Sequence, residues 1–273
     1  MKIVKSIALI LLILVILTVA FYLFWLFPRY TVPILTYHDF GYGKGILVTP
    51  ENFERQMHYL KTKGFNVISF GELAEGIKHG RKFAHNTVVI TMDDGYKDNF
   101  TYAYPALKKN GFPTMIFLIT NNIGTEATYL DWDQVREMSA HNISFGGHTK
   151  NHVYLPLIEK KEVLWEEIAG SKKAIEEHIG KPVDYFCYPL GGFTGEAEML
   201  VKKAGYKGAC TTNRGGDVLN RDNVYELNRI SIRNSDPYFS FSNLLYPIRF
   251  RAKLSGYYNL FRRKRGGGDE QYH

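Results

Sequence analysis

The chain has 273 residues, of which 45% are hydrophobic, and a formal net charge of +7 at pH 7. This length and apolar content suffice for one large α/β domain with an appendage, and we find no internal repeat and no second folded domain. Because the positive charge is not accompanied by a recognised nucleic-acid-binding motif, we do not expect a nucleic acid as partner.

The N-terminal segment has the composition of a membrane anchor. Residues 7–27 are almost entirely apolar, and a helix of that length spans roughly 30 Å, the thickness of a bilayer core. Lys2 and Lys5 precede this run, and positive charge favours the cytoplasmic side. We therefore predict that residues 1–30 form a single-pass transmembrane helix in the cell membrane. The rest of the chain would lie on the extracytoplasmic side.

A cleavable signal peptide is the alternative for this segment. Thr18-Val19-Ala20 would be a poor cleavage site and the apolar run continues past it, which favours an uncleaved anchor. Both interpretations take the remaining chain out of the cytoplasm, where a disulfide between Cys187 and Cys210 is permitted. Two buried thiols are the favoured interpretation, because neighbouring parallel strands often fail disulfide geometry.

Apolar runs typical of strands alternate with helical patterns along the rest of the chain. The expected strands are residues 32–37, 66–69, 87–92, 114–119, 143–147, 185–188, 208–212 and 229–233. The expected helices begin at Pro50 and after Ser69, and cover residues 100–110, 131–141, 159–179 and 195–203. Repeated strand–helix units imply a parallel sheet with right-handed crossovers. Seven or eight of them suggest closure into a (β/α) barrel over residues 31–236.

The remaining residues, 237–273, form a basic and aromatic tail. Cations interleave with aromatic side chains as far as Phe261, which is typical of interfacial membrane helices. A solvated, partly disordered end is the alternative, especially from Gly266 onward. The composition fits both interpretations equally.

Two adjacent carboxylates, Asp93 and Asp94, follow the expected strand at residues 87–92. Because strand side chains alternate between faces, neighbouring aspartates at the end of a strand can serve two functions. One can ligate a metal while the other handles a proton. A helix N-cap or a turn is the alternative, given the Gly95 that follows.

Two histidines, His148 and His152, follow the expected strand at residues 143–147. Their spacing lets a helical turn or tight loop point both imidazoles at one ion. With one aspartate they offer a carboxylate and two neutral nitrogens and leave an open position for water, as catalytic zinc sites do. This donor set favours zinc over calcium or magnesium, which prefer oxygen ligands. Surface histidines at this spacing are common, so the joint occurrence of the two motifs carries the prediction.

Together, Thr91-Met92-Asp93-Asp94-Gly95 and His148-Thr149-Lys150-Asn151-His152 resemble motifs of the polysaccharide deacetylase family, also called carbohydrate esterase family four. Three further segments support the resemblance: Asp131-Trp132-Asp133, Phe186-Cys187-Tyr188-Pro189-Leu190-Gly191 and Tyr37-His38-Asp39. The last resembles the branch that deacetylates poly-β-1,6-N-acetylglucosamine. The resemblance covers about residues 33–233 and implies a distorted (β/α) barrel with seven or eight parallel strands.

The resemblance also implies roles in a reaction. Asp94, His148 and His152 would ligate the metal, and Asp93 would be the general base. The backbone amide of Leu190 would donate a hydrogen bond to the oxyanion. The implied reaction is metal-dependent hydrolysis of N-acetyl groups from an extracellular N-acetylglucosamine polymer, with release of acetate. Zinc is the expected metal, with cobalt or nickel as alternatives.

The residues expected to contact the sugar are Asp131, Trp132, Tyr188 and Pro189. Trp132 and Tyr188 carry amphipathic rings that suit the faces of a pyranose, although packing in the core is the alternative for each. Pro189 would hold the loop around Leu190 in a fixed turn.

Two departures from the family pattern concern the proton transfers. Many relatives carry, in place of Cys187, an arginine that pairs with the base, so this support must come from elsewhere or be absent. Many also have Leu-x-His where this chain has Leu227-Asn228-Arg229. His38 is then the best remaining proton donor, because an adjoining carboxylate, Asp39, could raise its pKa. Sugar binding is the competing role for His38.

Three other functions compete with the deacetylation of poly-N-acetylglucosamine. The substrate could be peptidoglycan, chitin or acetylated xylan. The chain could also be a non-catalytic glycan-binding relative, although it keeps Asp93 and the three expected ligands. Only the C-terminal tail suggests a structural, membrane-tethered assembly factor.

Overall fold

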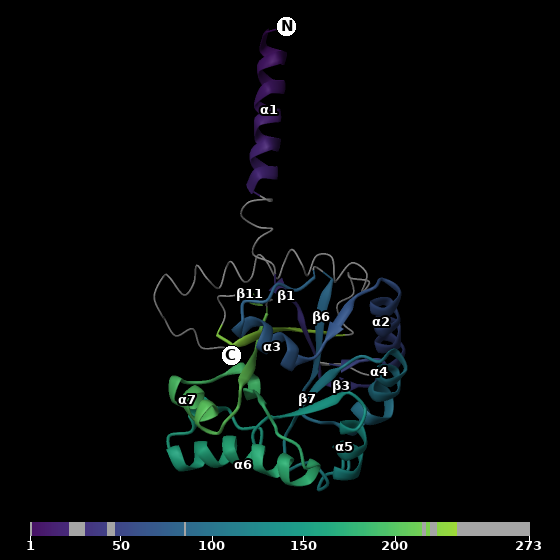
Figure 1. The fold of residues 1–273 in the computed structure, drawn as a ribbon, viewed down its shortest axis with the longest axis vertical. Coiled ribbons are helices and arrows are strands. Elements are labelled where there is room, and N and C mark those ends of the chain that lie inside the picture. Colours follow the sequence, from purple (N-terminus) through teal and green to yellow (C-terminus); the bar gives the residue numbers. More distant parts are fainter. Residues whose placement is uncertain are drawn as a thin grey trace.

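The computed structural model describes residues 2–21, 31–42, 47–84, 86–214, 217–218 and 223–233. Within these residues, a barrel of strands surrounded by helices follows a separate N-terminal helix (Figure 1). The predicted C-terminal tail, 237–273, lies outside the described residues, as do residues 22–30 of the predicted anchor.

Parallel strands form the centre of the fold. Their order around the ring is β2, β12, β10, β9, β8, β7 and β6, and β6 pairs back with β2. These strands are β2 (Ile34–Tyr37), β6 (Thr87–Met92), β7 (Thr114–Leu118), β8 (Ile143–Gly147), β9 (Tyr185–Cys187), β10 (Gly208–Arg214) and β12 (Leu227–Ser231). The predicted (β/α) barrel is therefore confirmed, with seven strands in the closed ring that the described residues form.

The other described strands lie outside this ring. An additional parallel strand, β5 (Asn66–Ile68), pairs with β6. Two short pairs complete the set: β1 (Thr31–Val32) with β11 (Asp217–Val218), and β3 (Asp39–Phe40) with β4 (Leu47–Val48).

Helices surround the ring (Figure 1), and several of them begin or end at a capping residue. Thr49, Ser69 and Asp131 each accept a hydrogen bond from a backbone amide of the first turn that follows, as N-caps do. Gly111 and Gly180 end two helices in the left-handed conformation. The helices are α2 (Pro50–Thr62), α3 (Phe70–Lys78), α4 (Tyr104–Asn110, after a π-helical turn at Asn99–Ala103), α5 (Trp132–Ser139), α6 (Lys161–Ile179) and α7 (Gly195–Lys203).

The N-terminal helix, α1 (Lys2–Phe21), stands apart from the barrel (Figure 1). Its large apolar side chains are exposed, from Val4 to Val19. Among the residues that the structure describes, however, no helix is both long enough and apolar enough to cross a membrane. The predicted transmembrane helix is therefore not supported, and its last part falls in residues 22–30, outside the described range.

Polar side chains replace apolar ones inside the barrel toward the carboxyl ends of the strands. Because side chains alternate along a strand, every second residue points inward. On β6, Val89 packs in the inner apolar cluster, Thr91 is hydrogen-bonded within the barrel, and Asp93 follows the strand. On β12, Leu227 belongs to the same apolar cluster and Arg229 to the polar layer. The polar layer thus leads directly to the predicted site.

Candidate active site

The three predicted metal ligands come together at the carboxyl ends of β6 and β8. Asp94 Oδ1 lies 3.5 Å from Nε2 of His148 and 3.5 Å from Nε2 of His152. Asp94 Oδ1 is buried without a hydrogen-bond partner. His148 Nδ1 lies 2.8 Å from the Cys187 carbonyl oxygen, which only accepts, so Nδ1 carries a proton and Nε2 is the atom that faces Asp94 and would bind a metal. This carboxylate and two imidazoles fit a divalent metal ion.

The backbone around these ligands adopts a conformation that L-residues avoid. Asp94, Thr149, His152 and Leu190 have positive φ angles of 71°, 62°, 56° and 56°. Asn142 completes the set of such non-glycine residues in the described part of the chain. Left-handed backbone at ordinary residues persists only where the surroundings impose it, and it gathers at functional sites. The strained backbone therefore lies in the loops that carry the metal ligands and Leu190.

Asp93 faces a different partner from Asp94. Its two oxygens each accept a 2.6 Å hydrogen bond from Arg229, whose side chain is fully buried. Arg229 also donates to the Thr211 carbonyl and to the hydroxyls of Thr36 and Thr91. Burial alone would raise the pKa of Asp93, but the Arg229 guanidinium outweighs burial and holds this pKa well below its usual range. Asp93 is thus ionised at neutral pH, as a general base must be.

The support for the base therefore comes from β12. The predicted strand at residues 229–233 would have started with Arg229, whereas the structure begins β12 at Leu227. Leu227 and Arg229 lie two residues apart, so both point into the barrel. Sequence reasoning missed the role of Arg229, and the only available signal was a cation two residues after a buried leucine.

Cys187 fills the space beside this ion pair. Its Sγ lies 3.0 Å from Nη2 of Arg229 and 3.9 Å from Oδ2 of Asp93. Burial raises the pKa of the Cys187 thiol well above its usual value, so the thiol is neutral. Cys187 and Cys210 pair across β9 and β10, and both are free and buried, in agreement with the favoured sequence interpretation.

Asp93, His148 and Cys187 also bring potential metal donors within 4.8 Å of one another. The Arg229 guanidinium occupies both oxygens of Asp93, however, and a second cation would be repelled there. The set around Asp94 is therefore the better metal site. Burial, and then the nearby His148, lower the pKa of His152, which favours the neutral form that binds metals.

His38 lies next to the base. Its Nε2 is 3.6 Å from Asp93 Oδ2, and its side chain is 19% exposed, so it is within reach of a ligand. Burial lowers the pKa of His38, while Asp93 and Asp94 act in the opposite direction. These two carboxylates act on His38 in place of the predicted Asp39, which hydrogen-bonds to Asp98. Burial and this contact raise the pKa of Asp98 to about 8.

The loop that carries Leu190 is held in one conformation. The Thr212 hydroxyl donates a 3.2 Å hydrogen bond to the Leu190 carbonyl, and Pro189 is buried. Gly191 has a φ of 75°, and a Cβ there would lie 2.1 Å from Thr212 Oγ1. The side chain of Leu190 is 64% exposed. The loop is thus rigid while its tip remains open to solvent.

Three predicted sugar-contacting residues also make contacts within the protein. The Tyr188 ring is fully buried and stacks on Phe193 with centroids 4.4 Å apart, so neither face is free for a pyranose. Trp132 stacks on His178 at 3.8 Å. Asp131 forms a capping box at the start of α5. Amphipathic rings pack in cores as readily as they bind sugars, and the structure favours packing for Tyr188.

A pocket of about 540 Å³ adjoins the candidate site. It is lined in part by Asp39, which follows His38, and by Tyr96 and Tyr129, whose ring centroids lie 4.9 Å apart. Burial, and then the Asp94 carboxylate, raise the pKa of Tyr96. No predicted site residue lines this pocket, but Tyr96 interacts with Asp94, so the pocket lies near the metal-ligand cluster and offers aromatic, acidic and basic side chains.

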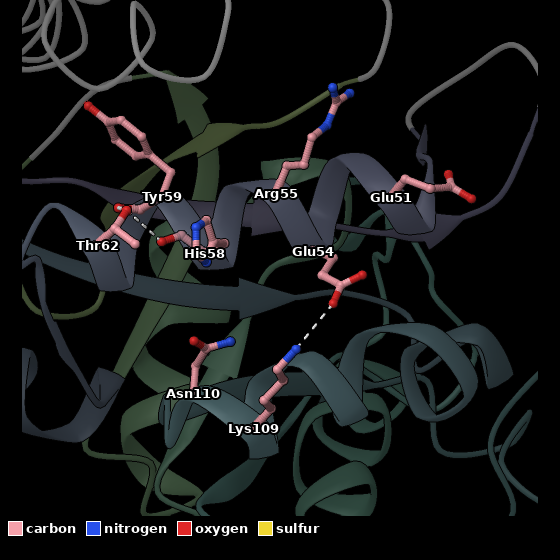
Figure 2. Close-up of a pocket in the computed structure, with 8 residues that line it drawn as sticks. All are labelled: Glu51, Glu54, Arg55, His58, Tyr59, Thr62, Lys109 and Asn110. Atoms are coloured by element: carbon pink, nitrogen blue, oxygen red, sulfur yellow. Dashed lines mark hydrogen bonds and ion pairs between the residues drawn. The ribbon is translucent and has the colours of Figure 1, made fainter.

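A second pocket, of about 550 Å³, lies between α2 and α4 (Figure 2). Lys109 on α4 pairs with Glu54 on α2 across it, at 3.5 Å. Its lining contains none of the predicted site residues: Glu51, Glu54, Arg55, His58, Tyr59, Thr62, Lys109 and Asn110. Unlike Tyr96 in the first pocket, no residue of this lining interacts with a predicted metal ligand in the contacts above, so the first pocket is the better substrate site.

Solved structures share this fold. The deacetylase PplD of Streptococcus pyogenes, determined in complex with acetate, matches with a TM-score of 0.74 and 27% identity, over 80% of this chain and 98% of PplD. The structure of IcaB from Ammonifex degensii matches with a TM-score of 0.71 over 81% of this chain and 97% of IcaB. The identity with IcaB is 22%, so this likeness shows the fold alone.

Sequence comparisons give the family. Residues 80–209 match the profile of the polysaccharide deacetylase family. A poly-β-1,6-N-acetyl-D-glucosamine N-deacetylase of Staphylococcus aureus is 26% identical over 60% of this chain and 60% of its own length. YxkH of Bacillus subtilis, named as a polysaccharide deacetylase, is 33% identical over 202 residues, which are 74% of this chain and 71% of YxkH. The chain therefore belongs to the polysaccharide deacetylase family, whose members are hydrolytic N-deacetylases.

Proposed function

We propose that this chain removes N-acetyl groups from an extracellular polysaccharide containing N-acetylglucosamine, by zinc-dependent hydrolysis that releases acetate. The observation that carries the proposal is the cluster of Asp94, His148 and His152 beside a buried, ionised Asp93. Resemblance to the Staphylococcus aureus enzyme supports the choice of polymer.

The side chains divide the reaction between them. Zinc held by Asp94, His148 and His152 would activate a water molecule and polarise the acetamide oxygen. Asp93 accepts the proton of the attacking water, since Arg229 keeps its carboxylate charged. The Leu190 amide would donate a hydrogen bond to the oxygen of the tetrahedral intermediate.

His38 is the proposed donor of the proton that the departing amine needs. It lies close enough to Asp93 to share one reaction centre. Its lowered pKa makes the imidazolium a stronger acid, while less of the enzyme carries that proton at neutral pH. Sugar binding by His38 is the competing role.

The pocket beside the cluster supports a polymeric sugar substrate. Tyr96 and Tyr129 offer ring surface, and Asp39 offers a hydrogen-bond acceptor. Peptidoglycan, chitin and acetylated xylan offer similar chemistry, so they are the alternative substrates. A non-catalytic glycan-binding protein would share the pocket but would not need the paired Asp93 and Arg229.

Acetate release from a panel of acetylated glycans tests the proposal. We expect release from poly-β-1,6-N-acetylglucosamine, loss of activity after exhaustive chelation, and recovery with zinc, cobalt or nickel. Full activity in a sample that elemental analysis shows to be metal-free would contradict metal dependence. Tight binding of the glycans without acetate release would favour the glycan-binding alternative.

We also propose that the catalytic domain lies outside the cytoplasm and that the N-terminal segment attaches it to the cell membrane. The exposed apolar side chains of α1, preceded by Lys2, support this location. In fractionated cells, the full chain should sediment with membranes and be digested by protease added outside. A chain starting at Pro28 should leave the membrane fraction and remain active on short oligomers. Full-length protein in the cytosolic fraction would contradict this location.

A further inference from the structure

A buried carboxylate on α6 holds the loop that connects the two histidine ligands. Glu167 is 6% exposed. Its Oε2 accepts hydrogen bonds from the backbone amides of Lys150 at 2.9 Å and Asn151 at 3.0 Å. Its Oε1 accepts from Nδ2 of Asn151 at 2.6 Å. One oxygen thus sits between two consecutive amides, an arrangement that backbone nests use to bind anions.

The opposite side of the same loop is held by the segment that follows β7. The Thr120 amide donates to the Thr149 carbonyl at 3.3 Å, and the Asn121 amide donates to the Lys150 carbonyl at 3.0 Å. The side chain of Asn121 also donates to Asn151 Oδ1, at 2.7 Å. Donors from the segment after β7 and an acceptor from α6 therefore fix the two central peptides between the ligands, 149–150 and 150–151.

This double attachment explains how the loop keeps its conformation. Thr149 and His152 have φ angles of 62° and 56°, in the left-handed region. Such residues relax to ordinary conformations unless their surroundings over-determine them. Since His152 ends the loop, relaxation would turn its imidazole away from Asp94, which now lies 3.5 Å from His152 Nε2.

We propose that Glu167 is a positioning residue that sets the metal affinity of the Asp94–His148–His152 site. The inference rests on the proposed metal-dependent function. This role also explains why Glu167 is buried. Burying a carboxylate is unfavourable unless donors surround it, and here the loop supplies three hydrogen bonds to it.

Zinc affinity of the metal-free protein, measured by competition with a chromophoric chelator, tests the inference without relying on activity. Glu167→Ala should weaken zinc binding about 10–100-fold, the usual effect of losing a partner that orients a ligand. Glu167→Gln keeps one acceptor oxygen for the two backbone amides and should recover part of the loss. Glu167→Asp keeps the charge but is one methylene shorter, so it should behave like Glu167→Ala.

Two matched variants separate this role from general destabilisation. Glu166→Ala removes the neighbouring, exposed carboxylate, which pairs only with the side chain of Lys150 among the loop residues. Ser171→Ala removes a buried hydroxyl of α6 that bonds to Ile168 and Tyr206. Both should bind zinc as the unmodified chain does, even if their thermal unfolding temperatures fall.

Each outcome bears on the inference. Wild-type zinc affinity in folded Glu167→Ala would overturn it and leave the proposed function intact. If Glu167→Ala does not fold, wild-type affinity in Glu167→Asp would overturn it equally. An unmodified chain that binds no zinc would overturn the inference together with the proposed function.

Discussion

Asp93→Asn should keep its zinc and lose turnover by about 10²-fold or more, whereas Asp94→Ala should lose the metal itself. The two carboxylates are neighbours in the chain but face different partners. Asp94 Oδ1 lies 3.5 Å from both histidine nitrogens, so its removal takes away one of three ligands. Asp93 is bonded to Arg229 instead, and an amide in its place cannot accept the proton of the attacking water.

Stability has to be measured beside activity for this pair. In Asp93→Asn the Arg229 cation stays fully buried without its counter-charge. Breaking a buried ion pair from one side costs about 3–5 kcal/mol. The thermal unfolding temperature of Asp93→Asn should therefore fall, and zinc content and kcat should be measured on folded protein well below it. Loss of zinc from Asp93→Asn, with retention by Asp94→Ala, would reverse the two roles.

The parts of the site that lie next to each other in the sequence were predictable. The apolar run at residues 87–92 forms β6 with these bounds, and Asp93 and Asp94 follow it. His148 likewise follows β8 directly. Because all barrel strands run in parallel, their carboxyl ends meet at one rim, and local patterns suffice to bring these residues together.

The sequence did not reveal two kinds of feature. One is contact between residues far apart in the chain, and the other is the burial of a single side chain. Arg229 is separated from Asp93 by 136 positions, and nothing local shows that the inward-facing positions of β12 run from buried Leu227 to a cation that meets a carboxylate of β6. Glu167 follows another glutamate on an amphipathic helix, and only packing shows that Glu167 is buried while Glu166 is exposed. Tyr188 has the composition of a sugar-binding residue but packs in the core.

Arg229→Met should move the acid limb of the kcat/KM profile to higher pH and leave zinc binding in place. In the unmodified chain the guanidinium outweighs burial, so the pKa of Asp93 lies well below its usual range. Without the guanidinium, burial raises this pKa. Asp93 must be ionised to accept a proton, so activity is lost at a higher pH as the solution is acidified.

Arg229→Lys separates the charge of Arg229 from its geometry. Lysine keeps a cation but replaces two parallel bonds to Asp93 with a point charge. It also loses some of the bonds that hold Arg229 to Thr36 and Thr211. We therefore expect a smaller shift of the acid limb than in Arg229→Met, together with a lowered kcat because the base is less well oriented. An unchanged acid limb in Arg229→Met would show that Arg229 does not control the ionisation of Asp93.

His38→Gln provides the complementary measurement in the same pH profiles. If His38 donates the proton to the amine, its loss should remove the alkaline limb and lower kcat, while zinc content and the acid limb stay as in the unmodified chain. Burial lowers the pKa of His38, so the alkaline limb should fall at a lower pH than an ordinary imidazole would give. A rise in KM with unchanged kcat would instead assign His38 to sugar binding. If Arg229→Met changes only the acid limb and His38→Gln only the alkaline limb, the two residues next to Asp93 serve separate proton transfers. Arg229 then keeps the base charged, and His38 supplies the acid.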